Sequence, residues 1–184
     1  EDRFARESAI ADLEVALALG GIDMEVVAVG GIGLGAERRT ELTAGGGVGG
    51  MIADWQSVLS AVRKLEGAAT LPVGYYGVSM GTAYGIPFLA TEPAIRVAAL
   101  GMWPDAVAGV TRLIEKAPAV RCAVQFVHRE EDQFFEQPAT RRLFDLLGSQ
   151  EKTFVVLPGP HEETPDQIQS AADYLAAHLT AAQT

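Results

Sequence analysis

Hydrophobic residues follow two alternating patterns along the chain. Short apolar runs, several of them rich in β-branched residues and closed by glycine, predict buried parallel strands. Segments in which apolar residues return every three or four positions predict helices between them. The expected strands are residues 24–30, 72–77, 95–102, 119–127 and 152–159. The expected helices are residues 1–20, 51–66, 80–90, 105–116, 138–148 and 165–179.

This alternation predicts an α/β fold: a doubly wound, mostly parallel sheet with helices on both faces. A length of 184 residues suits one domain, so residues 1–184 are expected to form a single unit. The glycine-rich stretch GGGVGG, residues 45–50, is expected to be a flexible connection. Residues 103–118 hold one helix between two strands and are expected to form a small cap or a connecting helix.

The charge balance narrows the expected partners. The chain carries 14 basic and 24 acidic residues, a formal net charge of −10. Such a field repels nucleic acid and anionic membrane surfaces, and no apolar run approaches the roughly 20 residues of a membrane helix. We therefore expect a small-molecule partner, with no nucleic acid and no membrane, and leave a homo-oligomer open.

The single cysteine, Cys122, cannot form an intramolecular disulfide and lies in an apolar run, so we expect a small buried hydrophobic residue. A lone cysteine is compatible with a reducing compartment, and the expected location is the cytoplasm. The sequence starts at Glu1, which is consistent with a preceding segment that is processed or missing.

The stretch GVSMG, residues 77–81, has the pattern GxSxG between a predicted strand and a predicted helix. Glycines on either side of Ser79 leave room for a sharp turn that exposes a strained serine hydroxyl, as a nucleophile requires. The alternative is an ordinary strand-to-helix turn in which Ser79 caps the helix.

A serine hydroxyl needs a positioned base before it can attack a carbonyl. Of the three histidines, His128 ends a predicted strand and His178 lies inside the last helix, where a surface or packing role is expected. His161 lies in a loop at the carboxyl end of the last strand, where parallel sheets assemble their sites. His161 is therefore the candidate base, against the alternative of an ordinary loop histidine.

A carboxylate is expected to orient that imidazole and stabilise its cation. The turn after the strand ending at Val127 offers three candidates: Glu130, Glu131 and Asp132. Three acids in a turn are also what a solvated loop contains, so the residues alone leave the choice open.

From about residue 5 to its end, the chain resembles α/β-hydrolases of the dienelactone-hydrolase and carboxylesterase-like group. The resemblance rests on GVSMG, on EEDQFFEQPATRRLFDLLGS and on LPGPHEETP. It implies Ser79 as nucleophile, Asp132 as the acid with Glu131 as second choice, and His161 as base. It also implies that the backbone N–H of Met80 donates one hydrogen bond to the oxyanion.

The beginning of the chain departs from that group. Members have a strand with a glycine-rich HGG-type loop that supplies the second oxyanion donor, and no such segment is present here. Two explanations stay open: the first strands of the fold are absent from this sequence, or residues 24–30 form the central strand. In the second case Gly31 or Ile32 supplies the donor.

Aromatic residues follow two of the predicted strands close to the candidate triad. Trp103 follows one strand, and Phe134 and Phe135 adjoin the acid turn. They are expected to wall a pocket for an acyl or alkyl group, with packing at the rim of the core as the alternative.

A different reading comes from GGIGLGAE, which also matches a dinucleotide-binding pattern through Gly31, Gly33 and Ala36. The segment from Thr40 to Gly50 interrupts the helix that should follow, which disfavours that reading. The three histidines are scattered along the chain, so no metal site is expected, and hydrolysis through an acyl-enzyme needs no cofactor.

The sequence thus predicts a serine hydrolase that cleaves a carboxylic ester or related acyl bond through Ser79, His161 and Asp132. A binding protein of the same fold without hydrolytic activity is the first alternative. A dinucleotide-binding oxidoreductase and an acyltransferase with the same three residues are the others.

Overall fold

The computed structural model describes residues 47–65, 68–107 and 114–180. The helix expected at 1–20, the strand at 24–30 and the glycine pattern at 31–36 lie outside the described residues. The chain divides into two compact units, residues 1–70 and 71–184, which are described separately. That residues 1–184 form one domain stays a prediction.

In the first unit, helix α3 (Gly47–Val62) begins one turn earlier than the hydrophobic pattern predicted. The expectation of a flexible connection over residues 45–50 is therefore wrong for its last four residues, which form the first turn of this helix. Glycine costs about 1 kcal/mol relative to alanine in a helix, which a run of good helix formers after it can offset. Arg63 follows the helix, and its guanidinium donates a hydrogen bond of 2.9 Å to the carbonyl of Ala69.

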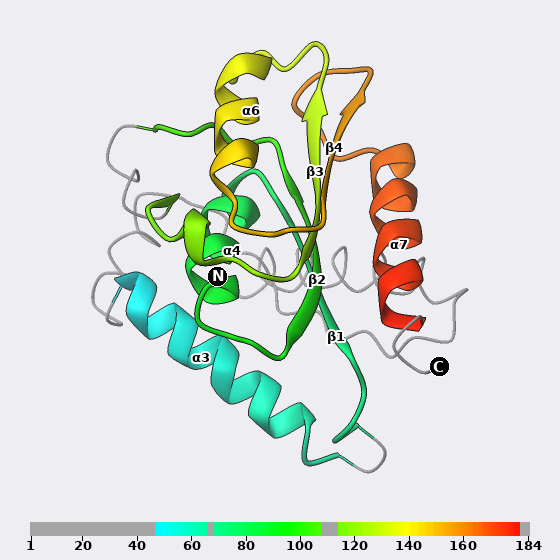
Figure 1. The fold of residues 1–184 in the computed structure, drawn as a ribbon. Coiled ribbons are helices and arrows are strands. Elements are labelled where there is room, and N and C mark those ends of the chain that lie inside the picture. Colours follow the sequence, from blue (N-terminus) through cyan, green and yellow to red (C-terminus); the bar gives the residue numbers. More distant parts are fainter. Residues whose placement is uncertain (1–46, 66–67, 108–113, 181–184) are drawn as a thin grey trace, which may run out of the picture. The chain divides into compact units, whose positions relative to one another are not determined.

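The second unit is built on a four-stranded, fully parallel sheet in the order β1-β2-β3-β4 (Figure 1). The strands are β1 (Val73–Val78), β2 (Ile95–Gly101), β3 (Ala123–Arg129) and β4 (Lys152–Leu157). The helices that connect or follow them are α4 (Met80–Leu89), η1 (Ala117–Ala119), α6 (Gln137–Leu146) and α7 (Pro165–Thr180).

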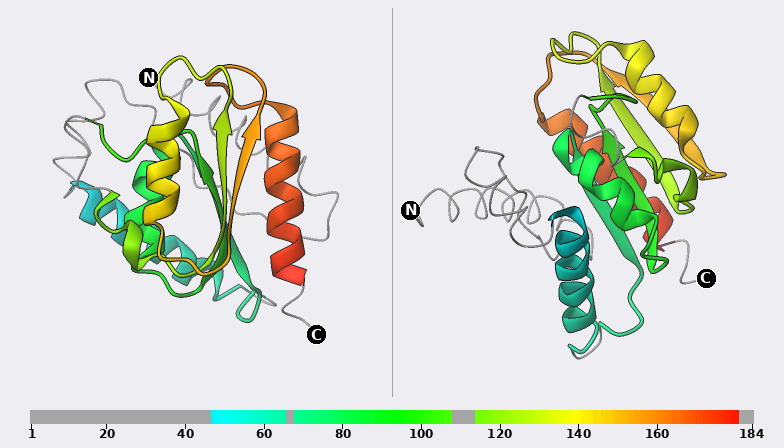
Figure 2. Two further views of the ribbon diagram at one scale, coloured as in Figure 1. Left: turned by 45° about the horizontal axis from the view of Figure 1, so that its top comes forward. Right: turned by 90° about the vertical axis from the view of Figure 1, so that its left-hand side faces the viewer.

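Helices cover both faces of this sheet. Helix α4 packs on β1 and β2 and helix α6 on β3, while α7 packs on β1, β2 and β3 from the other side (Figure 2). The predicted α/β fold with a parallel sheet is confirmed. Parallel strands joined through helices place all their carboxyl ends at one edge, where the following loops meet.

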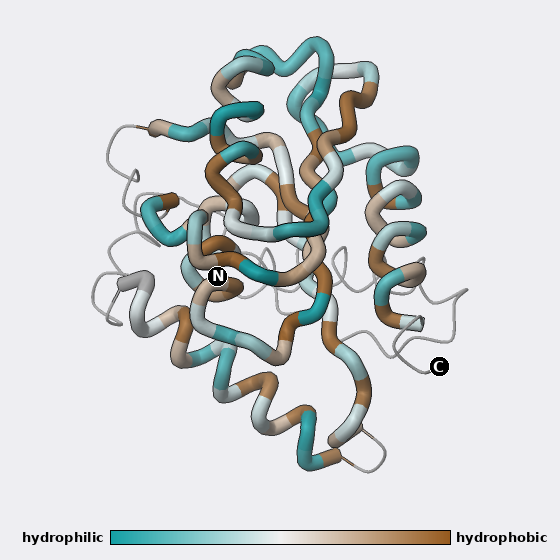
Figure 3. The backbone as a smooth tube through the Cα atoms, viewed as in Figure 1, coloured by the Kyte–Doolittle hydropathy of each residue, from teal (hydrophilic) through white to brown (hydrophobic). Residues whose placement is uncertain are grey.

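The two inner strands form the most buried part of the sheet. Val97 and Leu100 of β2 and Phe126 of β3 are fully or almost fully buried. Figure 3 shows hydrophobic stretches along the strands, whereas hydrophobic and hydrophilic segments alternate along α7. The loops that follow these strands therefore start from well-packed positions in the core.

One strand starts later than predicted. The expected strand over residues 119–127 begins at Ala123 and continues to Arg129. Residues 117–119 form the short helix η1, and Arg121, between η1 and β3, donates a hydrogen bond of 3.0 Å to the carbonyl of Val120. Ala119 therefore belongs to η1, and residues 120–122 have no regular secondary structure. His128 consequently lies inside β3.

Cys122 immediately precedes β3 and is only partly buried, so the expectation of a fully buried cysteine is not met. Burial still raises the pKa of its thiol to about 11. Such a thiol is protonated and unreactive at neutral pH.

The predicted cap, residues 103–118, lies partly outside the described residues. Residues 103–107 have no regular secondary structure. Asp105 in this segment forms a two-pronged ion pair with Arg142 of α6, with distances of 2.7 and 3.1 Å. That pairing fastens the start of the segment to α6.

Candidate active site

Ser79 occupies a sharp turn between β1 and α4. Its backbone has φ 53° and ψ −118°, a conformation that residues with a side chain rarely adopt. Its N–H donates a hydrogen bond of 2.9 Å to the carbonyl of Gly101 at the end of β2. Strain of this kind costs about 1–3 kcal/mol and persists only where the surrounding structure enforces it.

The two glycines of the GxSxG pattern have different roles. A Cβ atom on Gly77 would lie 2.7 Å from the Tyr75 hydroxyl and 3.0 Å from the carbonyl oxygen of Gly81, so no larger residue fits. A Cβ atom on Gly81 would meet nothing within 4 Å. The expectation that both glycines clear space for the turn therefore holds for Gly77 alone, because Gly81 faces open space at the start of α4.

Two side chains that the sequence analysis did not single out support this turn. The Tyr75 hydroxyl donates a hydrogen bond of 2.8 Å to the carbonyl of Gly81. The fully buried Thr82 hydroxyl lies 2.9 Å from the carbonyl oxygen of Gly77 and accepts a hydrogen bond of 2.7 Å from the N–H of Gly101. The turn is thus tied both to its own helix and to the neighbouring strand.

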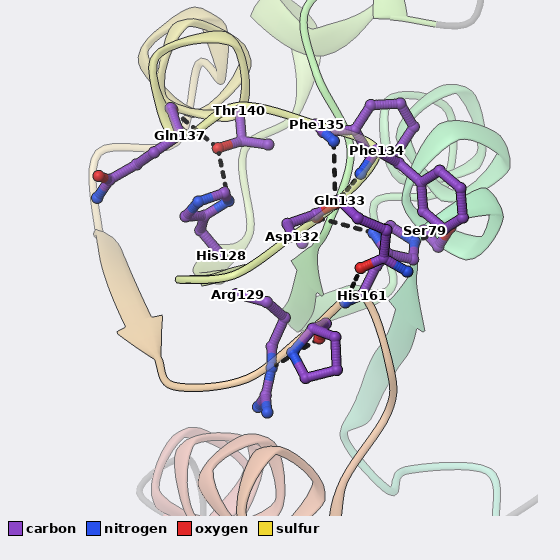
Figure 4. Close-up of polar contacts among 12 residues, drawn as sticks. Ser79, His128, Arg129, Asp132, Gln133, Phe134, Phe135, Gln137, Thr140 and His161 are labelled. Atoms are coloured by element: carbon purple, nitrogen blue, oxygen red, sulfur yellow. Dashed lines mark hydrogen bonds and ion pairs between the residues drawn. The ribbon is translucent and has the colours of Figure 1, made fainter.

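His161 and Asp132 come from the loops that follow β4 and β3, and both reach the serine turn (Figure 4). His161 Nε2 lies 2.9 Å from Ser79 Oγ. His161 Nδ1 lies 2.7 Å from Asp132 Oδ2. Three residues from three separate loops therefore form one continuous hydrogen-bonded chain.

The surroundings of Asp132 fix the carboxylate in this position. Its side chain is completely buried, and its Oδ1 atom accepts hydrogen bonds of 2.8 and 2.9 Å from the N–H groups of Phe134 and Phe135. The carboxylate accepts a hydrogen bond from His161 Nδ1–H, which leaves Nε2 with its lone pair toward the Ser79 hydroxyl. This is the arrangement in which the imidazole can remove the serine proton.

Glu131, the second choice for the acid, has another partner. Its carboxylate accepts a hydrogen bond from the N–H of Gly159, and its own N–H donates to the carbonyl of Gly159 at 3.1 Å. Glu131 therefore joins the acid loop to the histidine loop.

The other two histidines make structural contacts. His128 is buried, its Nδ1 lies 3.2 Å from the Thr140 hydroxyl, and its ring stacks on Phe154. Because the Thr140 hydroxyl donates to the carbonyl of Gln137, its oxygen can accept a hydrogen bond from His128 Nδ1–H. Burial lowers the pKa of His128, which is therefore neutral at physiological pH.

His178 near the end of α7 lies 2.9 Å from the carboxylate of Glu151 and 2.8 Å from the carbonyl oxygen of Tyr174. These contacts fit the surface or packing role expected for it.

Met80 is the first residue of α4, where backbone N–H groups have no acceptor within the helix. Its N–H is the one predicted for the oxyanion. The residues predicted for the second donor, Gly31 and Ile32, lie outside the described residues.

The predicted pocket aromatics gather around His161. The rings of Phe134 and Phe135 meet the His161 ring edge to face, with centroid distances of 5.1 and 5.4 Å. Trp103 is buried and meets Phe135 edge to face at 5.4 Å, whereas Phe134 is 66% exposed. Trp103 follows Met102, which has the unusual φ of 54° for a residue with a side chain. A strained turn thus directs the segment with Trp103 toward the acid loop.

Within the described part of the chain, no group of three or more histidine, cysteine or carboxylate side chains could hold a metal ion. No helix in that part combines the length and the apolar character that crossing a membrane requires.

Comparison with solved structures gives many matches to one fold. The native structure of a cold-adapted esterase from an Arctic intertidal metagenomic library matches with a TM-score of 0.70 and 34% identity, over 80% of this chain and 66% of that chain. The present chain therefore spans slightly less than two thirds of that esterase. No family model matches the sequence, and no curated protein does.

More distant matches agree on the fold. A 2,6-dihydroxy-pseudo-oxynicotine hydrolase has a TM-score of 0.60 at 16% identity, over 71% of this chain and 47% of that chain. The dienelactone hydrolase of Anabaena variabilis has a TM-score of 0.54 at 14% identity, over 73% of this chain and 60% of that chain.

A strained serine follows one strand of this parallel sheet, an acid follows another and a histidine follows the last. This order is typical of α/β-hydrolases. The chain belongs to the α/β-hydrolase superfamily. Its predicted resemblance to dienelactone hydrolase is confirmed at the level of the fold.

Proposed function

We propose that the protein is a serine hydrolase that cleaves a carboxylic ester or a related acyl bond of a small molecule. The hydrogen-bonded chain from Ser79 Oγ through His161 to Asp132 carries this proposal. The 34% identity to a cold-adapted esterase supports the ester as substrate class.

In the first half of the reaction, His161 Nε2 takes the proton of Ser79 Oγ while this oxygen attacks the ester carbonyl. Asp132 stabilises the imidazolium and keeps its orientation. The imidazolium then gives its proton to the departing alcohol oxygen, and the acyl group stays on Ser79.

In the second half, His161 takes a proton from a water molecule, whose oxygen attacks the acyl-enzyme. The proton returns to Ser79 Oγ as the carboxylic acid leaves. The Met80 N–H stabilises the negative oxygen in both halves.

The aromatic cluster of Trp103, Phe134 and Phe135 is the proposed wall of the acyl or alkyl pocket. The rings of Phe134 and Phe135 lie against the His161 imidazole, and Trp103 contacts Phe135. An apolar surface at this place suits a substrate with an uncharged hydrocarbon part near the scissile bond.

Two alternatives share this geometry: a binding protein of the same fold, and an acyltransferase that passes the acyl group to an acceptor other than water. The position of His161 Nε2 at 2.9 Å from Ser79 Oγ favours a catalytic protein over a binding protein, because binding alone does not need a base at the hydroxyl. The superfamily assignment disfavours a dinucleotide-binding oxidoreductase.

The test is a series of p-nitrophenyl esters of increasing acyl length, hydrolysed by the 184-residue chain and by its Ser79→Ala variant. We expect the variant to lose turnover by several orders of magnitude with an unchanged circular dichroism spectrum. Equal rates for both proteins would refute Ser79 as nucleophile. Turnover that needs an added alcohol acceptor would identify an acyltransferase.

A further inference from the structure

A buried arginine lies under the loop that carries His161. Arg129 is the last residue of β3, and its side chain is 3% exposed (Figure 4). A buried guanidinium is costly unless its N–H groups have partners, so its contacts indicate what it is for.

Those partners lie in the middle of the histidine loop, at its end and in the first turn of α7. Arg129 Nε donates to the carbonyl of Pro160, the residue before His161, at 3.3 Å. Arg129 Nη1 donates to the hydroxyl of Thr164 at 3.1 Å and lies 3.5 Å from a carboxylate oxygen of Asp166 in the first turn of α7. One planar group thus spans the loop from its middle to the start of the next helix.

The loop is shaped to receive this group. Gly159 has φ 107°, and a Cβ atom there would overlap Nη2 of Arg129. The Thr164 hydroxyl donates its proton to Asp166, so its oxygen is available to accept from Arg129. The hydrogen bond from Thr164, together with the charge of Arg129, lowers the pKa of Asp166, which stays ionised opposite the arginine at neutral pH.

We propose that Arg129 is a positioning residue that holds the loop of residues 158–164 so that His161 lies within hydrogen-bonding distance of both Ser79 and Asp132. Arg129 does not touch Ser79 or the predicted substrate position, and it acts through the backbone next to His161. The planar guanidinium reaches Pro160 and Thr164 together, which the single ammonium group of lysine does not do in the same geometry. The expected effect of Arg129 on turnover rests on the proposed function, whereas its expected effect on the position of His161 does not.

The test compares Arg129→Lys with a matched control, Arg141→Lys. Arg141 lies on α6 with a side chain that is 53% exposed and pairs with Asp145 four residues along the same helix. Each variant is measured for kcat and KM on a p-nitrophenyl ester, for the rate of fluorophosphonate labelling, and for the strongly downfield NMR signal of the His161 Nδ1 proton. The His161→Gln variant assigns that signal.

For Arg129→Lys we expect kcat and the labelling rate to fall together by about 10- to 100-fold, because small displacements of a reacting group have effects of that size. KM should change little, and the His161 proton signal should shift or broaden. Arg141→Lys should match the wild type in all three measurements.

A lower melting temperature with an unchanged proton signal and unchanged kcat would overturn the proposal, since Arg129 would then be structural only. If the wild type hydrolyses no ester, the proposed function fails and the NMR signal alone decides the role of Arg129. If Arg129→Lys does not fold, Thr164→Val, which removes one acceptor of the guanidinium, is judged by the same measurements and the same outcomes.

Discussion

Tyr75 and Gly81 connect the end of β1 to the start of α4 across the serine turn. The Tyr75 hydroxyl donates a hydrogen bond of 2.8 Å to the carbonyl of Gly81, and burial raises the pKa of this phenol. A Cβ atom at Gly77 or Gly85 would lie less than 3 Å from the same side chain. The strained conformation of Ser79 is thus held by an aromatic residue that fills the space left by two glycines.

Removal of that hydroxyl should loosen the turn. For Tyr75→Phe we expect a loss of about 0.5–1.5 kcal/mol in the free energy of unfolding, because one hydrogen bond is removed. Urea titration measures the loss. The matched control is Tyr174→Phe, because the Tyr174 hydroxyl is buried without a hydrogen-bond partner among the described residues. Its removal should not lower the free energy of unfolding. Equal stability of the two variants would contradict the role given to Tyr75.

The hydrogen bond between Asp132 and His161 should control turnover through the imidazole tautomer. In Asp132→Asn the amide N–H₂ can face His161 Nδ1, which favours the proton on Nε2 and removes the acceptor that Ser79 needs. We expect kcat to fall by about 10³- to 10⁴-fold with little change in KM. Steady-state kinetics on a p-nitrophenyl ester provide the measurement.

The control for that substitution is Glu131→Gln, which removes a charge in the neighbouring position. Its effect on kcat should be at least tenfold smaller, because Glu131 bonds to Gly159 and not to His161. A larger loss of kcat in Glu131→Gln than in Asp132→Asn would mean that Glu131, and not Asp132, is the acid partner of His161.

Neutral His128 should make the fold sensitive to acid. The pKa of His128 is lowered from the ordinary value of 6.5 mainly by burial. The charge of Asp132 raises this pKa, and the charge of His161 lowers it further. The unfolded chain therefore binds a proton near pH 6.5 that the folded chain does not, so stability falls as the pH drops from about 6.5 toward the folded pKa. In His128→Gln this part of the pH dependence should disappear.

Urea midpoints at pH 7.5 and pH 5 measure this difference for wild type and variant. All other titrating groups are common to both proteins, so only the difference between their two pH dependences is informative. Parallel slopes would mean that His128 is protonated in the folded state as readily as in the unfolded state.

Phe134 should matter for substrates and not for folding. It is 66% exposed and lies against His161, so truncation removes little buried area but takes away part of the proposed pocket wall. For Phe134→Ala we expect kcat/KM to fall more for long-chain than for acetyl p-nitrophenyl esters, with an unchanged melting temperature. A uniform loss over all chain lengths would argue against contact with the acyl group.

The sequence pattern predicted the four strands and the helices α4, α6 and α7, because short apolar runs alternate with segments of helical period. The helix predicted over residues 105–116 is absent at residues 105–107, and the structure does not describe residues 108–113. The boundaries were less predictable. Ala123 starts a strand that the apolar run 119–127 placed four residues earlier, because an apolar run does not show where sheet pairing begins. Similarly, Gly47 begins a helix although glycine-rich sequence usually indicates a loop.

The candidate triad could be predicted because each member stands at a marked place: a glycine-flanked turn or a loop after a strand. The residues that hold these three side chains in position could not be predicted from the sequence. Tyr75, Thr82 and Arg129 look like ordinary strand and helix residues, and their importance comes from contacts with segments 6 to 35 positions away. Only the fold brings those contacts together. The roles of Met80 and of the second oxyanion donor stay predictions.

The most direct measurement is the intact mass of the chain after reaction with a fluorophosphonate, with the modified residue mapped by fragmentation. Wild type should gain one adduct on Ser79, while Ser79→Ala should gain none and His161→Gln should react far more slowly. No adduct on the folded wild type, or one on a residue other than Ser79, would contradict a nucleophile activated by His161.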